Sequence, residues 1–284
     1  MAVIYVSIGL MALLGIAFGV VLAVASKKFA VHMDPRAERV YEVLPHIDCG
    51  ACGQKGCRDY AAKVAAGEVP VDLCVPGGVE TARSVAAIMG VPFAEDRVPT
   101  RAVVHCQGGR GEAVEEFQYD GVPDCRAAVV VQGGPKACKF GCIGFGTCAE
   151  VCPYDAIEMS EGRLPMIDEA KCVSCGLCVK ACPRQLITLM PKTQRVILGC
   201  SNHERGKVVK DACNVGCIAC GICVKQSKES GAVQLVENLP VIDYDKWTDA
   251  EQAACMEKCP MHCYWRQASA EEVVPEREEA EAVC

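Results

Sequence analysis

The sequence predicts an α+β protein with a single N-terminal transmembrane helix, a small cysteine-rich module and two tandem cysteine-rich units. Three observations support this prediction. Residues 2–25 contain no charged side chain. The 284 residues include 23 cysteines, most of them in short loops with regular spacing. A set of four cysteines recurs after 75 residues, which indicates an internal repeat.

Composition and motifs limit the function. Aromatic residues make up only 5% of the chain, so few large side chains are present to build an apolar core. The net charge of −7 and the lack of a long basic run argue against a nucleic-acid partner. No G-x-G-x-x-G follows a strand and opens a helix, and no Ser/His/Asp set is suggested. We therefore expect no catalytic residues on this chain.

Residues 1–28 are expected to form a membrane anchor. The uncharged run 2–25 is long enough to cross a lipid bilayer as a helix. Lys27 and Lys28 follow it, which predicts a single-pass protein of the cell membrane whose soluble parts face the cytoplasm. A cleaved signal peptide is the alternative, but no Lys or Arg precedes the run. Gly15 and Gly19 form a G-x-x-x-G that would let another helix approach, although a lipid-facing helix also tolerates glycine.

Residues 29–92 are expected to form a small module with one metal centre. Asp34-Pro35 is a helix start signal, and further helices are expected at 58–66 and 77–90. Between the helices lies a C-x2-C-x4-C-x16-C pattern, formed by Cys49, Cys52, Cys57 and Cys74. Four thiolates suit a zinc ion or a [4Fe–4S] cluster, and the company of the other motifs favours the cluster.

Residues 100–195, which begin with a strand at Arg101, contain the most specific motif. It reads Cys172-x2-Cys175-x2-Cys178-x3-Cys182-Pro183, the spacing of bacterial ferredoxins that bind [4Fe–4S] clusters. Three cysteines of such a loop bind one cluster and the fourth binds another. A zinc ribbon would instead use two separated cysteine pairs. This stretch is therefore predicted to be a ferredoxin-like domain with two clusters.

The internal repeat predicts a second ferredoxin-like domain at residues 196–268. Its members are Cys125, Cys138, Cys142 and Cys148, which return as Cys200, Cys213, Cys217 and Cys223. Phe145 stands where Cys220 stands in the second unit, so Cys138 is expected to supply the missing ligand in the first. The first unit would then hold one cluster on Cys138, Cys142, Cys148 and Cys182. Its other cluster would use Cys152, Cys172, Cys175 and Cys178.

The second unit is expected to hold one cluster. Ser227 replaces the counterpart of Cys152, and Trp247 replaces that of Cys172. Cys217, Cys220, Cys223 and Cys259 remain, with Cys213 as a competing ligand. About four clusters are thus expected in all, on Cys49, Cys52, Cys57, Cys74, Cys138, Cys142, Cys148, Cys152, Cys172, Cys175, Cys178, Cys182, Cys213, Cys217, Cys220, Cys223 and Cys259. No role is assigned to Cys106, Cys125, Cys200, Cys255, Cys263 or Cys284. The acidic stretch 269–284 is expected to be a disordered tail.

From Met1 to about Cys263 the chain resembles the B subunit of the Rnf complex, the ion-translocating ferredoxin:NAD oxidoreductase of anaerobic bacteria. The x4/x16 spacing and the x3/x5/x3 spacing from Cys138 to Cys152 carry the resemblance. One departure is Leu44-Pro-His-Ile-Asp48, where the family usually has Leu-Pro-Gly-Ala-Asn. The resemblance implies a subunit of an inner-membrane translocase. It also implies reduced ferredoxin as electron donor, partner subunits that bind flavin and NAD, and coupled transport of Na+ or H+.

Two other functions fit the same motifs. The chain could be a membrane-tethered electron donor to another acceptor, such as nitrogenase or a redox regulator. It could also be a scaffold that donates iron–sulfur clusters, although crossed ligands favour electron transfer. Lys136, Lys139, Lys192 and Arg195 could steer an acidic ferredoxin, or they could be ordinary solvated surface.

Overall fold

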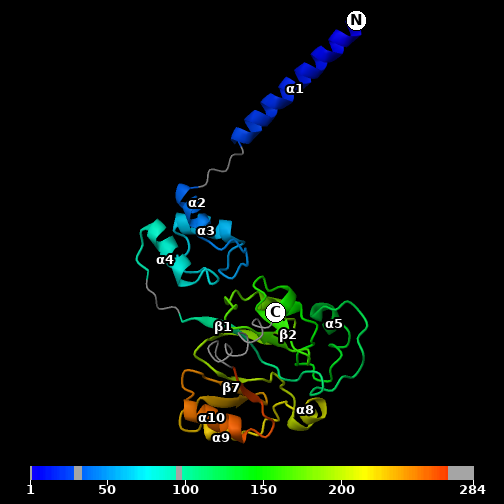
Figure 1. The fold of residues 1–284 in the computed structure, drawn as a ribbon, viewed down its shortest axis with the longest axis vertical. Coiled ribbons are helices and arrows are strands. Elements are labelled where there is room, and N and C mark those ends of the chain that lie inside the picture. The colour runs from blue at the N-terminus through cyan, green and yellow to red at the C-terminus, as the bar shows by residue number, and fades with distance from the viewer. Residues whose placement is uncertain (1, 29–33, 94–97, 268–284) are drawn as a thin grey trace, which may run out of the picture.

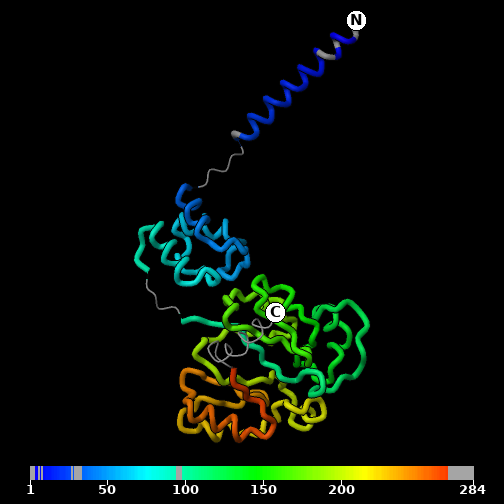
Figure 2. The backbone as a smooth tube through the Cα atoms, viewed as in Figure 1, coloured from blue at the N-terminus to red at the C-terminus, as the bar shows by residue number. Residues whose placement is uncertain are grey.

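The computed structural model describes residues 2–28, 34–93 and 98–267 (Figure 2). Helices and short antiparallel strands are mixed along the chain, so the predicted α+β class is confirmed. The expected acidic tail and Cys284 lie outside the described residues. The predicted anchor helix, the three helices of the next module and the strand at Arg101 are all present.

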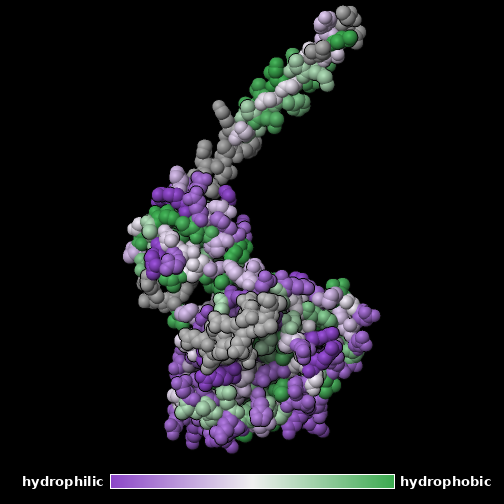
Figure 3. All heavy atoms as spheres, viewed as in Figure 1, coloured by the Kyte–Doolittle hydropathy of each residue, from purple (hydrophilic) through white to green (hydrophobic). Residues whose placement is uncertain are grey.

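Helix α1 (Ala2–Lys28) stands apart from the rest of the chain (Figure 1). Its window Gly9–Ser26 is wholly unburied, has a mean hydropathy of 2.3, and makes the helix long and apolar enough to cross a membrane. Figure 3 shows apolar side chains along the visible face of α1, whereas the visible face of the globular part is largely hydrophilic. A Cβ added at Gly15 or Gly19 would meet nothing within 4 Å, so this face is open to a partner or to lipid.

The N-terminal module consists of α2 (Pro35–Glu42), α3 (Cys57–Ala66) and α4 (Gly78–Met89). Asp34 caps α2 by accepting a hydrogen bond from the backbone N–H of Arg36 at 2.8 Å. The three helices pack around a small core that includes Val40, Tyr60, Val64 and Val85. This core holds the loops between the helices, which carry the cysteines.

The first unit is closed by pairing its first and last strands. Strand β1 (Thr100–Val104) runs antiparallel to β4 (Ile187–Pro191), with Ala102 opposite Leu189. Between them lie α5 (Cys125–Val130), α6 (Thr147–Glu150), the hairpin of β2 (Ile157–Met159) and β3 (Pro165–Ile167), and α7 (Leu177–Ala181).

The second unit has the same plan. Strand β5 (Val196–Leu198) pairs with β8 (Tyr264–Arg266), and β6 (Val233–Val236) pairs with β7 (Leu239–Ile242). Its helices are α8 (Gly206–Ala212), α9 (Ile222–Gln226) and α10 (Asp249–Lys258). The two units lie against each other in Figure 1, and the repeat seen in the sequence is thus a repeat of structure.

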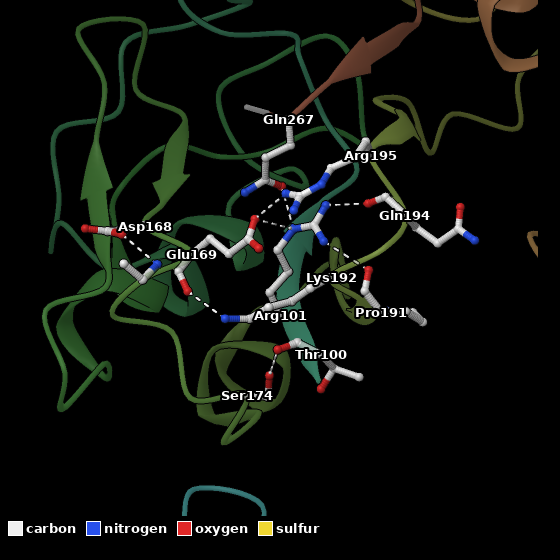
Figure 4. Close-up of polar contacts among 11 residues, drawn as sticks. Thr100, Arg101, Asp168, Glu169, Ser174, Pro191, Lys192, Gln194, Arg195 and Gln267 are labelled. Carbon is white, nitrogen blue, oxygen red and sulfur yellow. Dashed lines mark hydrogen bonds and ion pairs between the residues drawn. The ribbon is translucent and has the colours of Figure 1, made fainter. Parts of the chain in front are cut away.

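A buried ion-pair network in the first unit contacts the second unit through Gln267 (Figure 4). Arg101 of β1 is 0% exposed, and its guanidinium donates to the carbonyls of Pro191 and Gln194 and to Oε1 of Gln267. The carboxylate of Glu169 lies 2.6 Å from Arg195 and 3.6 Å from Arg101. The network therefore fixes β1, the end of β4 and the segment after β8 around one carboxylate.

One of the four basic residues expected to steer an acidic ferredoxin is buried. Lys136 is 2% exposed, so it cannot contribute to such a surface. Arg195 binds Glu169, Nζ of Lys192 donates to the backbone carbonyl of the same residue at 3.0 Å, and exposed Lys139 pairs with Glu116 at 2.8 Å. A steering role for these three residues stays a prediction.

Replacing Glu169 by Ala should destabilise the protein strongly, because it leaves two arginines beside each other without their carboxylate. Breaking a buried ion pair typically costs about 3–5 kcal/mol. The measurement is the urea midpoint of far-UV circular dichroism, recorded anaerobically. Asp243→Ala is the control, because Asp243 and Lys246 form an exposed pair, and such pairs contribute roughly 0–1 kcal/mol. Equal midpoints for the two variants would contradict this account.

Candidate metal centres

Five cavities in the described part of the chain are lined by four or more cysteines. Their empty volumes are similar, between about 320 and about 420 Å³. The sets are Cys49, Cys52, Cys57 and Cys74; Cys152, Cys172, Cys175 and Cys178; Cys125, Cys142, Cys148 and Cys182; Cys106, Cys138, Cys200 and Cys213; and Cys217, Cys220, Cys223 and Cys259, with Cys255 and Cys263 also at the wall of the last.

The spacing of the sulfur atoms distinguishes clusters from single ions. Among the described residues, no group of three or more His, Cys, Asp or Glu side chains is close enough to hold a single metal ion. A zinc site would bring four sulfurs to about 2.3 Å from one centre. Here each cavity is lined by four or more cysteines without such a close group, and no described cysteine forms a disulfide. Four thiolates around such a space fit a [4Fe–4S] cluster.

In the N-terminal module the loop before α3 is shaped by backbone turns. Asp48 accepts a hydrogen bond from the N–H of Cys57 at 2.6 Å, which fixes the first turn of α3 against the loop. Gly50 and Gly53 have φ of 64° and 77°, a region that glycine enters without strain. His46 also has a positive φ, 56°, at the place where the resembled family has glycine. A contact of 2.6 Å between its Nε2 and the carbonyl of Tyr41 offsets that strain.

Three loops of the two units share one backbone shape. Each has two left-handed residues, two positions apart, directly before a short helix. The pairs are Gly144 and Gly146 (φ 91° and 78°), Ser174 and Gly176 (59° and 73°), and Ala219 and Gly221 (56° and 71°). The same curl presents the cysteines of each loop to one cavity.

The cysteines that precede prolines also occupy equivalent places. Sγ of Cys182 accepts a hydrogen bond from the N–H of Leu186 at 3.4 Å, and Sγ of Cys259 accepts one from Cys263 at the same distance. Cys152 lies in the cavity of the 172–178 loop, and Cys182 lies in that of the 142–148 loop. The crossed arrangement expected of two-cluster ferredoxins is therefore present geometrically.

Cys125, rather than Cys138, lies with Cys142, Cys148 and Cys182. Phe145 occupies the middle position of this loop and packs on Tyr119, with ring centroids 5.2 Å apart. Cys125 opens α5, and its N–H donates to Oγ1 of Thr147 at 2.8 Å, which fastens α5 to the loop. The grouping expected from the sequence is corrected here. The helix-capping Asp124 directly before Cys125 was the available signal, because a cap places the next residue at a helix start.

In the second unit the lost half-site is filled by side chains. Trp247 is buried between Tyr244 and Tyr264, with ring centroids 5.8 and 5.7 Å away. Buried Ser227 lies 4.0 Å from the sulfur of Cys255. Aromatic packing thus occupies the region where the first unit has its 172–178 loop, and Cys255 is left as a buried thiol.

Burial sets the electrostatics of the two cavities of the first unit. It raises the pKa of Cys148 to about 11 and that of Cys178 to about 12, because a buried thiolate loses its hydration. Neighbouring thiols raise both pKa values further. Thiolates at these places need positive charge from bound iron, so cluster binding should be coupled to folding.

The fold and the cysteine cavities define the chain as a multi-cluster iron–sulfur protein of ferredoxin type with an apolar N-terminal helix. Family models match at residues 44–76 ("Putative Fe-S cluster") and at residues 141–186 ("4Fe-4S dicluster domain").

Whole-chain relatives narrow this class to one family. The chain is 44% identical to the B subunit of the Na(+)-translocating ferredoxin:NAD(+) oxidoreductase complex of Acetobacterium woodii, over 92% of this chain and 77% of the relative. It is 44% identical to the B subunit of the proton-translocating counterpart of Clostridium ljungdahlii, over 88% of each chain. Identity to the B subunit of the ion-translocating oxidoreductase complex of Methanosarcina acetivorans is 37%, over 89% of this chain and 95% of the relative. The chain belongs to the family of Rnf complex B subunits.

Replacing Cys125 by Ala should remove one cluster, which is about four irons and four sulfides per chain. The reason is that Cys125 completes the cysteine set of the 142–148 loop. Iron and acid-labile sulfide assays on anaerobically purified protein measure the loss. Ser227→Ala is the control, since Ser227 is buried and lines none of the five cavities. The assignment fails if Cys125→Ala keeps the iron content of the unchanged protein.

Proposed function

We propose that this chain is the iron–sulfur electron carrier of a membrane-bound ferredoxin:NAD oxidoreductase complex. It takes electrons from reduced ferredoxin and relays them to partner subunits that bind flavin and NAD, and the complex couples this transfer to transport of Na+ or H+. Four clusters are counted here: one in the N-terminal module, two in the first unit and one in the second. The observation that carries the proposal is that the second unit, the first unit and the N-terminal module each contain cavities lined by four or more cysteines. In Figure 1 the N-terminal module lies between α1 and the two units.

Contacts between the N-terminal module and the first unit support the exit side of this path. Nζ of Lys180, in α7, donates to the carbonyl of Gly50 at 3.2 Å. Tyr154 lines the cavity of the 172–178 loop. Burial raises the pKa of Tyr154 to about 12, with contributions from nearby Cys175 and Cys49, which belong to the two different sites. These two sites are therefore neighbours, and electrons can pass from the first unit to the module beside the membrane.

The entry side of the path is assigned to the second unit. Among the described cysteines only Cys220 is exposed, so its cluster would lie closest to the surface. Gly206 packs tightly on this loop, since a Cβ there would lie 2.6 Å from the carbonyl of Ile218. Arg205 and Lys207, on either side of Gly206, and Lys225, in the helix after the loop, have exposed side chains. A basic rim around an exposed cluster suits an acidic electron donor.

The charges after the apolar helix bear on which side of the membrane the soluble domains face. Lys27 and Lys28 after the apolar run favour cytoplasmic soluble domains, which protease digestion of sealed vesicles of known orientation would test. The two relatives at 44% identity name different ions, sodium and proton. Similarity to these relatives therefore fits transport of either ion.

Burial of nearly all described cysteines favours a protein that keeps its clusters over a scaffold that donates them to other proteins.

Cys259→Ala in the assembled complex should abolish NAD+ reduction by reduced ferredoxin, because it breaks the path at the entry cluster. The measurement is anaerobic NADH formation, with subunit assembly checked by gel filtration. Ser227→Ala, a buried change outside the cysteine cavities, should leave the rate unchanged. If the intact complex passes electrons from ferredoxin to another acceptor but never to NAD+, the proposed function is wrong.

Reversing the charge of the entry rim should weaken the encounter with ferredoxin. The double variant Lys207→Glu/Lys225→Glu should raise KM for reduced ferredoxin by roughly tenfold at low salt, and the effect should shrink as salt screens the charges. The readout is the rate against ferredoxin concentration at several ionic strengths. Arg39→Glu, an exposed change on α2 of the N-terminal module, serves as control. An unchanged KM in the double variant would move the entry site elsewhere.

A further inference from the structure

We propose that Cys106, Cys138, Cys200 and Cys213 hold a fifth [4Fe–4S] cluster at the junction of the two units. The four line one cavity, together with Lys136 and Asn202. The site itself stands on this geometry. Only its part in electron transfer rests on the function proposed above.

The cavity forms where corresponding segments of the two units meet. Cys106 lies two residues after β1, and Cys200 lies two residues after β5. The loops that carry them are joined, because the N–H of Gln107 donates to the carbonyl of Gly199 at 3.0 Å and Oγ of Ser201 donates to that of His105 at 3.0 Å. Two of the four sulfurs are thus held together by backbone contacts between the units.

The other two sulfurs are placed by a segment that contacts both units. Its residues 112–116 bond to the chain before Cys138, where the N–H of Ala137 donates to Val114 at 2.9 Å. They also bond to the chain around Cys213, where the N–H of Asn214 donates to Glu112 at 2.9 Å. Cys138 and Cys213 correspond in the 75-residue repeat, so each unit contributes an equivalent residue to one cavity.

Three of the sulfurs already have hydrogen-bond donors. The N–H of Cys142 lies 3.3 Å from Sγ of Cys106, and the N–H of Cys217 lies 3.3 Å from Sγ of Cys200. Nδ2 of Asn202 lies 3.4 Å from Sγ of Cys138. N–H donors to cysteine sulfur stabilise the thiolate form and tune the potential of iron–sulfur clusters. These donors would therefore stabilise the thiolate form of three of the four cysteines when a cluster is bound.

A buried lysine is the independent observation that points to an anionic occupant. Lys136 is 2% exposed and lines the cavity, and its Nζ donates to the carbonyl of Gly108 at 2.7 Å. Among the described residues, no carboxylate forms an ion pair with Lys136. A buried ammonium is costly unless a negative charge compensates it. Four thiolates around a [4Fe–4S] core carry net negative charge, which would balance the lysine.

Glycines at the wall of the junction cavity leave space beside the cysteine sulfurs. A Cβ on Gly108 would lie 3.0 Å from Sγ of Cys213, and one on Gly141 would lie 3.4 Å from Sγ of Cys138. The empty volume of the cavity, about 370 Å³, is like that of the other four. As in those cavities, the cysteines are not drawn together around a single ion.

The junction cluster would close the gap between the units. Cys142 belongs to the first-unit site, and its N–H bonds to Cys106 of the junction; Cys217 belongs to the second-unit site, and its N–H bonds to Cys200. Each neighbour is thus one hydrogen bond away. An electron accepted by the second-unit cluster reduces the junction cluster, which is reoxidised by the first-unit cluster, with no other reactant required.

The test is the iron and sulfide content of the full-length protein purified anaerobically. We expect about 20 irons per chain rather than about 16. Cys138→Ala and Cys200→Ala should each lose about four irons, and the double variant should lose no more than either one, because both serve the same cluster. Cys138→Ala combined with Cys125→Ala should lose about eight. Ser227→Ala, a buried change outside the five cavities, is the control that keeps all.

Further variants guard against misfolding. Cys200→Ser preserves side-chain volume and should still lose one cluster. Lys136→Met should keep the iron count and lower the reduction potential of one cluster in potentiometric EPR, because it removes a cation that favours the reduced form. An unchanged iron content in both Cys138→Ala and Cys200→Ser overturns the proposal, and so does loss of one zinc in place of four irons. Either result leaves the proposed function intact, because that function is tested separately, by NAD+ reduction in the Cys259→Ala complex.

Discussion

The cost of burying thiolates is the constraint on which this structure depends. Nearly all described cysteines are buried or half-buried, and burial alone would keep them as neutral thiols. They gain no compensation from disulfides, and the apolar cores between them are small. Iron binding therefore supplies both the counter-charge for the sulfurs and much of the stability of the short loops around them.

Local spacing shows which cysteines share a loop, but it does not show which distant cysteine lies beside them in the fold. Cys172, Cys175 and Cys178 share one curled loop, so their sequence spacing fixes their geometry. Cys125 reaches the 142–148 loop only because α5 is fastened to Thr147, a contact between residues 22 positions apart. The fold class, the anchor helix and the repeat were readable because each rests on periodicity or composition. The junction cavity was not, since it depends on how β1 and β5 lie relative to each other.

The second unit shows what takes the place of a cysteine loop in this fold. Trp247 and the tyrosines beside it occupy the region, and Ser227 places a small polar group next to Cys255. An aromatic side chain buries a large area, so it can stabilise the core where the first unit has its 172–178 loop. The unit keeps its strands and helices, and its remaining cysteine loop reaches the surface at Cys220.

The position of the junction cavity has a consequence for assembly. Each unit offers two of the four cysteines: one lies two residues after its first strand, and the other corresponds to its partner in the 75-residue repeat. If the units were separate chains, the cavity could form only where two chains associate, and its formation would depend on protein concentration. Within one chain the two units meet intramolecularly, at a high effective concentration.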